Sequence, residues 1–191
     1  MDQENTTPKP SEPAENNPRK EREVCAPRPR NVGKGWVELP VDLWGSCVNL
    51  FIGTRDEMSD DVELYFCGRD AEIAVADNWL RRHPSGDKHT DGDTFGDSGL
   101  VFIRVNTFFL GDLDDLAILS HECLHAANSI LRHIGVMGDD NVEVLAYTQE
   151  FIFKGLLKKI MSDKISPIGS VPPPKLDLER LFGQTQEGGR S

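Results

Sequence analysis

The pentapeptide H-E-C-L-H at residues 121–125 combines residue types that bind a metal ion and move a proton. His121 and His125 are four residues apart, so on a helix they lie one turn above each other on one face. Two imidazoles placed in this way can bind one zinc ion at about 2.0 to 2.1 Å each. Glu122 lies beside them, and its carboxylate can accept a proton from water held at the metal. The pattern therefore predicts a Zn²⁺ site with Glu122 as the general base.

This chemistry requires a helix, and the flanking residues predict one over residues 114–134. Asp112 has the side chain of an N-cap residue, and Gly135 is typical of the residue that follows a helix end. Apolar or small side chains recur at three- and four-residue spacing and indicate one buried face: Leu116, Leu119, Cys123, Ala127, Ile130 and Ile134. The histidines lie on a different face. An exposed polar helix face without a metal is the competing interpretation.

A zinc site needs a third protein ligand, and a second predicted helix, over residues 141–160, offers one. Glu143 lies eighteen residues after His125, which is enough for a helix end, a turn and the start of an antiparallel helix. Glu150 is the second candidate. A capping box formed by Asp140 and Glu143 would explain Glu143 without a metal. Tyr147 lies one turn beyond Glu143 and is a candidate donor to an oxyanion, although an aromatic residue here also suits packing.

The motif His121-Glu122-x-x-His125, followed by Glu143-x-x-Ala146-Tyr147, resembles the zincin metallopeptidases of the gluzincin type. More narrowly, the stretch 119–147 is similar to small metallopeptidase-like proteins encoded by bacteriophages and prophages. The resemblance implies a minimal zincin core in which His121, His125 and Glu143 hold zinc and Glu122 is the base. It also implies that the strand before the motif helix, residues 100–107, borders the cleft. That segment fits an open edge that accepts a peptide and an ordinary core strand equally well.

The remaining elements predict an α+β fold, with a small, mainly antiparallel sheet packed on the motif helix and on the helix that follows it. Segments 36–41, 47–52 and 61–67 are predicted strands, and 70–83 is a predicted helix. Residues 85–98 are rich in Gly and Asp and are predicted to form a loop with an acidic turn at 91–97.

Composition divides the chain into three parts. It has 191 residues and a net charge of −11, and the acidic surplus lies wholly within residues 34–162. Ten of the twelve prolines lie outside that range. We therefore expect a domain at 34–162 between disordered tails at 1–33 and 163–191. The segment 176–182 is a candidate docking peptide in a tail that is otherwise expected to be flexible.

The charge and the hydropathy pattern also bear on partners and location. An acidic chain is a poor match for nucleic acid or for an anionic membrane surface. No run of about eighteen apolar residues and no apolar leader segment is present, so we expect a cytoplasmic protein, in the host cell if it is phage-encoded. The expected partner is a peptide or protein substrate. The oligomeric state is left open.

The leading hypothesis is a zinc-dependent peptidase that hydrolyses peptide bonds. A non-enzymatic phage accessory protein that keeps a metal site and binds partners through its tails or helix faces is the first alternative. An acidic DNA mimic is the second, although basic residues such as Arg81, Arg82 and Lys154 interrupt any continuous acidic stripe.

Overall fold

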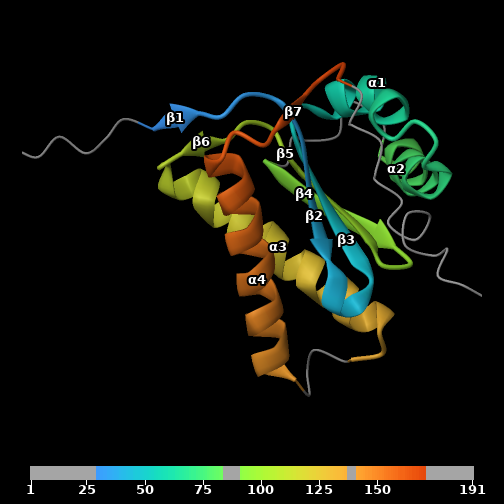
Figure 1. The fold of residues 1–191 in the computed structure, drawn as a ribbon, viewed down its shortest axis with the longest axis vertical. Helices are drawn as coiled ribbons and strands as arrows, with labels where there is room; N and C mark the ends of the chain where they lie inside the picture. Colours follow the sequence, from blue (N-terminus) through green and yellow to red (C-terminus); the bar gives the residue numbers. More distant parts are fainter. Residues whose placement is uncertain (1–28, 84–90, 137–140, 171–191) are drawn as a thin grey trace, which may run out of the picture.

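The computed structural model describes residues 29–83, 91–136 and 141–170 (Figure 1). Within these ranges the chain forms two sheets and two pairs of α-helices. In chain order the elements are β1 (Arg30–Asn31), β2 (Gly35–Val41), the 3₁₀ helix η1 (Asp42–Trp44), β3 (Ser46–Ile52), α1 (Arg55–Tyr65), α2 (Asp70–Arg82), β4 (Gly92–Asp97), β5 (Leu100–Val105), β6 (Phe109–Leu110), α3 (Leu113–His133), α4 (Val142–Met161) and β7 (Ser166–Pro167).

The larger sheet has the strand order β4-β5-β3-β2-β7. β3 and β5 run parallel, from the pair Cys47 and Leu100 to the pair Ile52 and Val105. The other neighbouring strands of this sheet are antiparallel, and β1 pairs with β6 in a separate short ribbon. A mainly antiparallel sheet with packed helices is an α+β fold, which confirms the predicted class.

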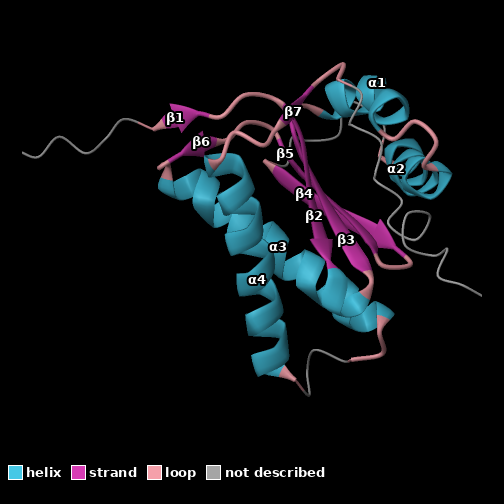
Figure 2. Ribbon diagram, in the orientation of Figure 1, coloured by secondary structure: helices cyan, strands magenta, loops and turns pink. Residues whose placement is uncertain are grey.

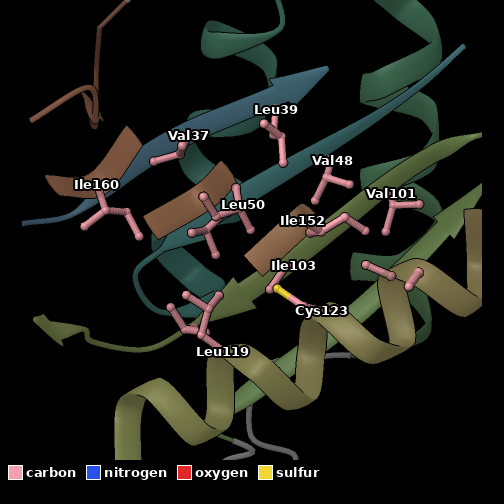
Figure 3. Packing of buried hydrophobic residues seen from close by; sticks show 14 of the residues in the cluster. Val37, Leu39, Val48, Leu50, Val101, Ile103, Leu119, Cys123, Ile152 and Ile160 are labelled. Atoms are coloured by element: carbon pink, nitrogen blue, oxygen red, sulfur yellow. The ribbon is translucent and has the colours of Figure 1, made fainter. Parts of the chain in front are cut away.

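Helices cover both faces of this sheet (Figure 2). Strand residues alternate between the faces, and the odd-numbered positions of β2 and β5 meet α3 and α4. This side forms an aliphatic core, in which Ile103, Leu119 and Ile152 come from β5, α3 and α4 (Figure 3). The two helices of the expected minimal domain therefore occupy one face only.

The opposite face carries an aromatic cluster covered by α1 and α2. Trp36 stacks on Tyr65 with ring centroids 5.1 Å apart and meets Phe66 edge-on at 4.9 Å. The Trp36 indole donates a hydrogen bond to Asp61 at 2.8 Å, and Asp61 also accepts from the backbone of Gly169 at 2.7 Å. A buried carboxylate needs hydrogen-bond donors. Asp61 therefore links the segment after β7 to this face of the sheet.

The prediction of a strand at 61–67 is wrong, because these residues belong to α1 and the turn that follows it. The alternation of Val62, Leu64 and Phe66 suggested a strand, but Leu64 is exposed and Tyr65 is buried. A capping box starts the helix: Glu57 donates its backbone N–H to the Thr54 hydroxyl, and its carboxylate accepts from the Thr54 backbone N–H. Buried residues then follow helical spacing, so the period of two was misleading. The predicted helix at 70–83 is confirmed as α2.

The prediction of an acidic turn at residues 91–97 is also wrong. Six of these residues form β4, an antiparallel hairpin partner of β5, with the turn at Ser98 and Gly99. The earlier part of the predicted loop, 85–90, lies outside the described residues. β5 is paired on both sides, so the segment 100–107 is a core strand and the open-edge alternative fails there. β4 is the outermost strand at this side of the sheet.

The two predicted C-terminal helices are confirmed as α3 and α4. Asp112 caps α3 by accepting from the backbones of Asp114 and Asp115, at 2.9 and 3.3 Å. Gly135 has φ of +80°, and the backbone N–H of Val136 donates to the carbonyl of Leu131, which is a Schellman ending. Ile134, a member of the predicted buried face, is exposed because it lies at the helix end.

Paired strands extend past both boundaries expected for the domain. β1 lies before residue 34 and β7 lies after residue 162, and each pairs with another strand. Residues 1–28 and 171–191 of the expected tails, which include the candidate docking peptide 176–182, and the possible cap Asp140 lie outside the described residues. None of the helices within the described ranges combines the length and the apolar character needed to cross a membrane.

Candidate metal centre

The α3 helix positions the motif by burying its aliphatic side against the sheet. Leu119, Cys123 and Ala127 are buried in the core between α3 and β5. His121 and His125 are exposed on another side of the helix. The helix therefore presents two imidazoles to solvent from a backbone fixed by packing, which is the arrangement the sequence predicts.

The histidine pair converges on one point. Nε2 of His125 lies 3.0 Å from Nε2 of His121, with ring centroids 4.6 Å apart and rings nearly perpendicular. Two nitrogens bound to one tetrahedral zinc ion at about 2.05 Å would be about 3.3 Å apart. The observed separation is close to this value, so the pair fits two of the ligand positions. Among the described residues no third His, Cys, Asp or Glu joins it in a group that could hold a metal.

Glu122 points from the same helix toward β4. Its side chain is only 7 % exposed, and the Thr94 hydroxyl donates a hydrogen bond to its Oε2 at 2.5 Å. That distance is typical of a hydroxyl bound to a charged carboxylate. Glu122 and the histidine pair therefore leave α3 in different directions, with Glu122 beneath the outermost strand.

Gly92 leaves the space that Glu122 fills. A Cβ at Gly92 would lie 2.9 Å from Cγ of Glu122 and 3.0 Å from its Oε1. Next to Gly92, the Asp93 carboxylate accepts from Nε of Arg104 at 2.9 Å and from a second nitrogen of the same guanidinium. Because Arg104 is a buried residue of β5, this ion pair anchors β4 over the motif helix.

Cys123, within the motif, is a core residue. Its side chain points into the aliphatic cluster (Figure 3). Burial, with a smaller contribution from the nearby Glu122, raises the pKa of the thiol to about 12. A thiol that stays protonated at neutral pH is a poor nucleophile or metal ligand, so the chemistry of the motif belongs to its histidines and its glutamate.

The proposed third ligands lie on α4, which crosses α3 where Gln149 donates a hydrogen bond to the Ser120 backbone at 3.0 Å. Glu143 is exposed and lies six residues before this crossing, about 9 Å along the helix axis. Glu150 lies at the crossing, but its carboxylate pairs with Lys154. The structure therefore brings His121 and His125 together and does not gather either glutamate with them.

Tyr147 lies away from the motif. It is 68 % exposed and lines an apolar groove together with Val41, Trp44, Val144 and Phe151. No residue of the motif lines this groove. A role for Tyr147 as an oxyanion donor stays a prediction.

Thr94 and Gly92 were missed by the sequence analysis, because their segment was interpreted as a loop. The available signal was weak: glycines at 92 and 96 alternate with Thr94, and a glycine within a strand often marks a close approach of another group.

No protein-family model, curated protein or solved structure matches the chain in the comparisons made. The site therefore rests on its own geometry.

Proposed function

We propose that the protein is a zinc-dependent peptidase. The observation that carries the proposal is the convergence of two exposed imidazoles, 3.0 Å apart at Nε2, on a helix that also carries a buried carboxylate between them in sequence. Purely structural zinc sites are usually closed by four protein ligands and need no base. Two histidines and an adjacent glutamate suit hydrolysis better.

In the proposal His121, His125 and Glu143 hold the ion. Bound zinc would polarise the scissile carbonyl and acidify water. Glu122 accepts a proton from the attacking water, whose oxygen forms a bond to the carbonyl carbon. When the carbon–nitrogen bond breaks, the same proton passes from Glu122 to the amine nitrogen, so Glu122 ends the cycle ionised.

The expected substrate is a peptide in extended conformation. β4 is the outermost strand beside the motif helix, and within the described residues no strand pairs with its outer edge. An extended peptide can add to such an edge through backbone hydrogen bonds. This would align a peptide bond along β4, directly above the helix that carries Glu122.

Zinc content and cleavage of a broad peptide library test the proposal together. We expect one zinc per chain in the wild type and in Glu122→Gln, with at least a hundredfold loss of cleavage in the variant, because general-base catalysis contributes about 10² to 10⁴-fold. Equal cleavage by the two proteins would exclude Glu122 as the base. No cleavage by either protein would contradict the peptidase function.

Glu143→Ala and Glu150→Ala form a matched pair that tests the third ligand. Both residues are exposed acidic positions of α4. We expect Glu143→Ala to weaken zinc binding by at least tenfold and Glu150→Ala to leave it within twofold of the wild type, as measured by competition with a chelator. The reverse result would assign the third position to Glu150.

The apolar groove on α4 favours a second candidate, the non-enzymatic interaction protein. Val144, Tyr147 and Phe151 are exposed there and enclose about 300 Å³ with Trp44. Exposed apolar surface of this kind often binds a protein partner. This candidate predicts that the protein cleaves no peptide. It also predicts that partner binding is unchanged in Glu122→Gln.

The cytoplasm, of the host cell if the protein is phage-encoded, is the proposed compartment. Cys67 and Cys123 are free thiols. Cysteines that stay unpaired are typical of reducing compartments.

A further inference from the structure

The Glu122 carboxylate lies against two residues of one strand, β4. Oε2 accepts the Thr94 hydroxyl at 2.5 Å, and Oε1 lies in the space left by the missing side chain of Gly92. The Thr94 hydroxyl also lies 3.1 Å from the Glu122 backbone carbonyl. A hydroxyl has one proton to donate, and the closer, charged carboxylate is the stronger acceptor.

Thr94 is itself firmly placed. It lies in the middle of β4 opposite Ile103, a buried residue of β5. Its branched side chain has few rotamers, and the neighbouring Asp93 is bound to the buried Arg104. A glutamate side chain has three rotatable bonds, and ordering it has an entropic cost. The strand therefore supplies a rigid support for a flexible side chain.

We infer that Thr94 is the positioning residue of the general base. Its hydroxyl fixes Oε2 of Glu122 and leaves Oε1 to accept and return the proton, in the space that Gly92 provides. This inference rests on the proposed function. It also ties substrate binding to catalysis, because the strand expected to pair with the peptide is the strand that orients the base.

Thr94→Val is the direct test, since valine keeps the shape and the strand preference and removes only the donor. We expect kcat for a cleaved peptide to fall about tenfold with KM and zinc content within twofold of the wild type. Thr94→Ser, which keeps the hydroxyl, should recover at least half of the lost kcat. The control is Thr148→Val, which removes another buried hydroxyl, donated to the carbonyl of Val144. It should leave kcat unchanged.

A double-mutant cycle in the zinc-free protein tests the contact without any activity. Thr94→Val should lower the urea midpoint of unfolding when Glu122 is present and have at most a small effect in the Glu122→Met background. Wild-type kcat in Thr94→Val, equal loss in Thr94→Ser and Thr94→Val, or additive effects in the cycle would each overturn the inference. Coupling in the cycle without peptide cleavage by the wild type would instead contradict the proposed function alone.

Discussion

The buried polar groups on the two faces of the larger sheet have different kinds of partner. On the face covered by α1 and α2, Arg69 binds Glu38 at 2.7 Å, Arg104 binds Asp93, and the buried Asp61 accepts from the Trp36 indole and the Gly169 backbone. On the face covered by α3 and α4, Glu122 is buried with the Thr94 hydroxyl as its donor. The polar groups of the first face link elements of the fold to one another, whereas Glu122 lies within the candidate metal-binding motif. Changes on the first face should alter stability, and changes around the motif should alter zinc binding and catalysis.

Trp36→Ala should produce the largest loss of stability on the aromatic face. The indole packs against four aromatic rings and donates to Asp61, so its removal leaves a cavity and a carboxylate short of one donor. Large aromatic truncations in cores cost about 3 to 5 kcal/mol. The measurement is urea unfolding followed by circular dichroism. Trp44→Ala, a partly exposed tryptophan on the other side, should cost less than half as much; equal losses would remove the distinction between the faces.

Arg104→Met should destabilise the protein by about 3 kcal/mol, because it leaves the mostly buried Asp93 without its partner. Asp93→Asn in the same background should recover part of the loss by removing the unpaired charge. Thermal unfolding of the two variants checks this order. If the double variant is less stable than Arg104→Met, loss of the ion pair is not the cause of the lower stability of Arg104→Met.

Much of the helical part of the fold follows from the sequence, since α2, α3 and α4 have clear apolar spacing and their ends are marked by residues such as Asp112 and Gly135. The sheet was harder to predict. β4 contains four acidic or glycine positions that are typical of turns, and only its pairing with β5 makes it a strand. In α1 the capping box at Thr54 and Glu57 was present in the sequence, but the alternation from Val62 onward competed with it. Local patterns do not record tertiary pairing.

The candidate site divides in the same way. The spacing of His121 and His125 depends on one helix, so the sequence is sufficient to predict that they meet. The third ligand depends on the angle at which α4 crosses α3, and the contact of Thr94 with Glu122 depends on the register of β4. Neither the crossing angle nor the strand register can be predicted from the residues of one helix or one strand.

Glu57→Gln should have a moderate effect that depends on pH. Hydrogen bonds from Lys34 and from the Thr54 backbone hold the pKa of Glu57 below its usual value of 4.5. A lowered folded-state pKa gives stability that is present above the unfolded pKa and is lost as the pH falls through the folded pKa. Glutamine keeps an acceptor for the Thr54 backbone N–H, so the variant loses the charge only. We therefore expect a loss of up to about 1 kcal/mol in the free energy of unfolding at pH 7, and this loss narrows below pH 4.5. Glu63→Gln, an exposed change on the same helix, is the control; equal pH profiles for the two variants would contradict the capping role.

His121→Ala and His125→Ala should have the smallest effect on the stability of the zinc-free protein. Both imidazoles are exposed, and substitutions at such positions usually change the free energy of unfolding by less than about 0.5 kcal/mol. The same variants should lose most of the bound zinc, because each removes one of two converging nitrogens. In the wild type, added zinc should raise the unfolding midpoint by mass action, and in the variants this rise should disappear. His133→Ala, an exposed histidine at the end of the same helix, should keep both the zinc and the rise. If the histidine variants keep their zinc, the pair does not bind it. If they lose as much stability as Trp36→Ala, the pair stabilises the fold. Either result would contradict the contrast between the two faces.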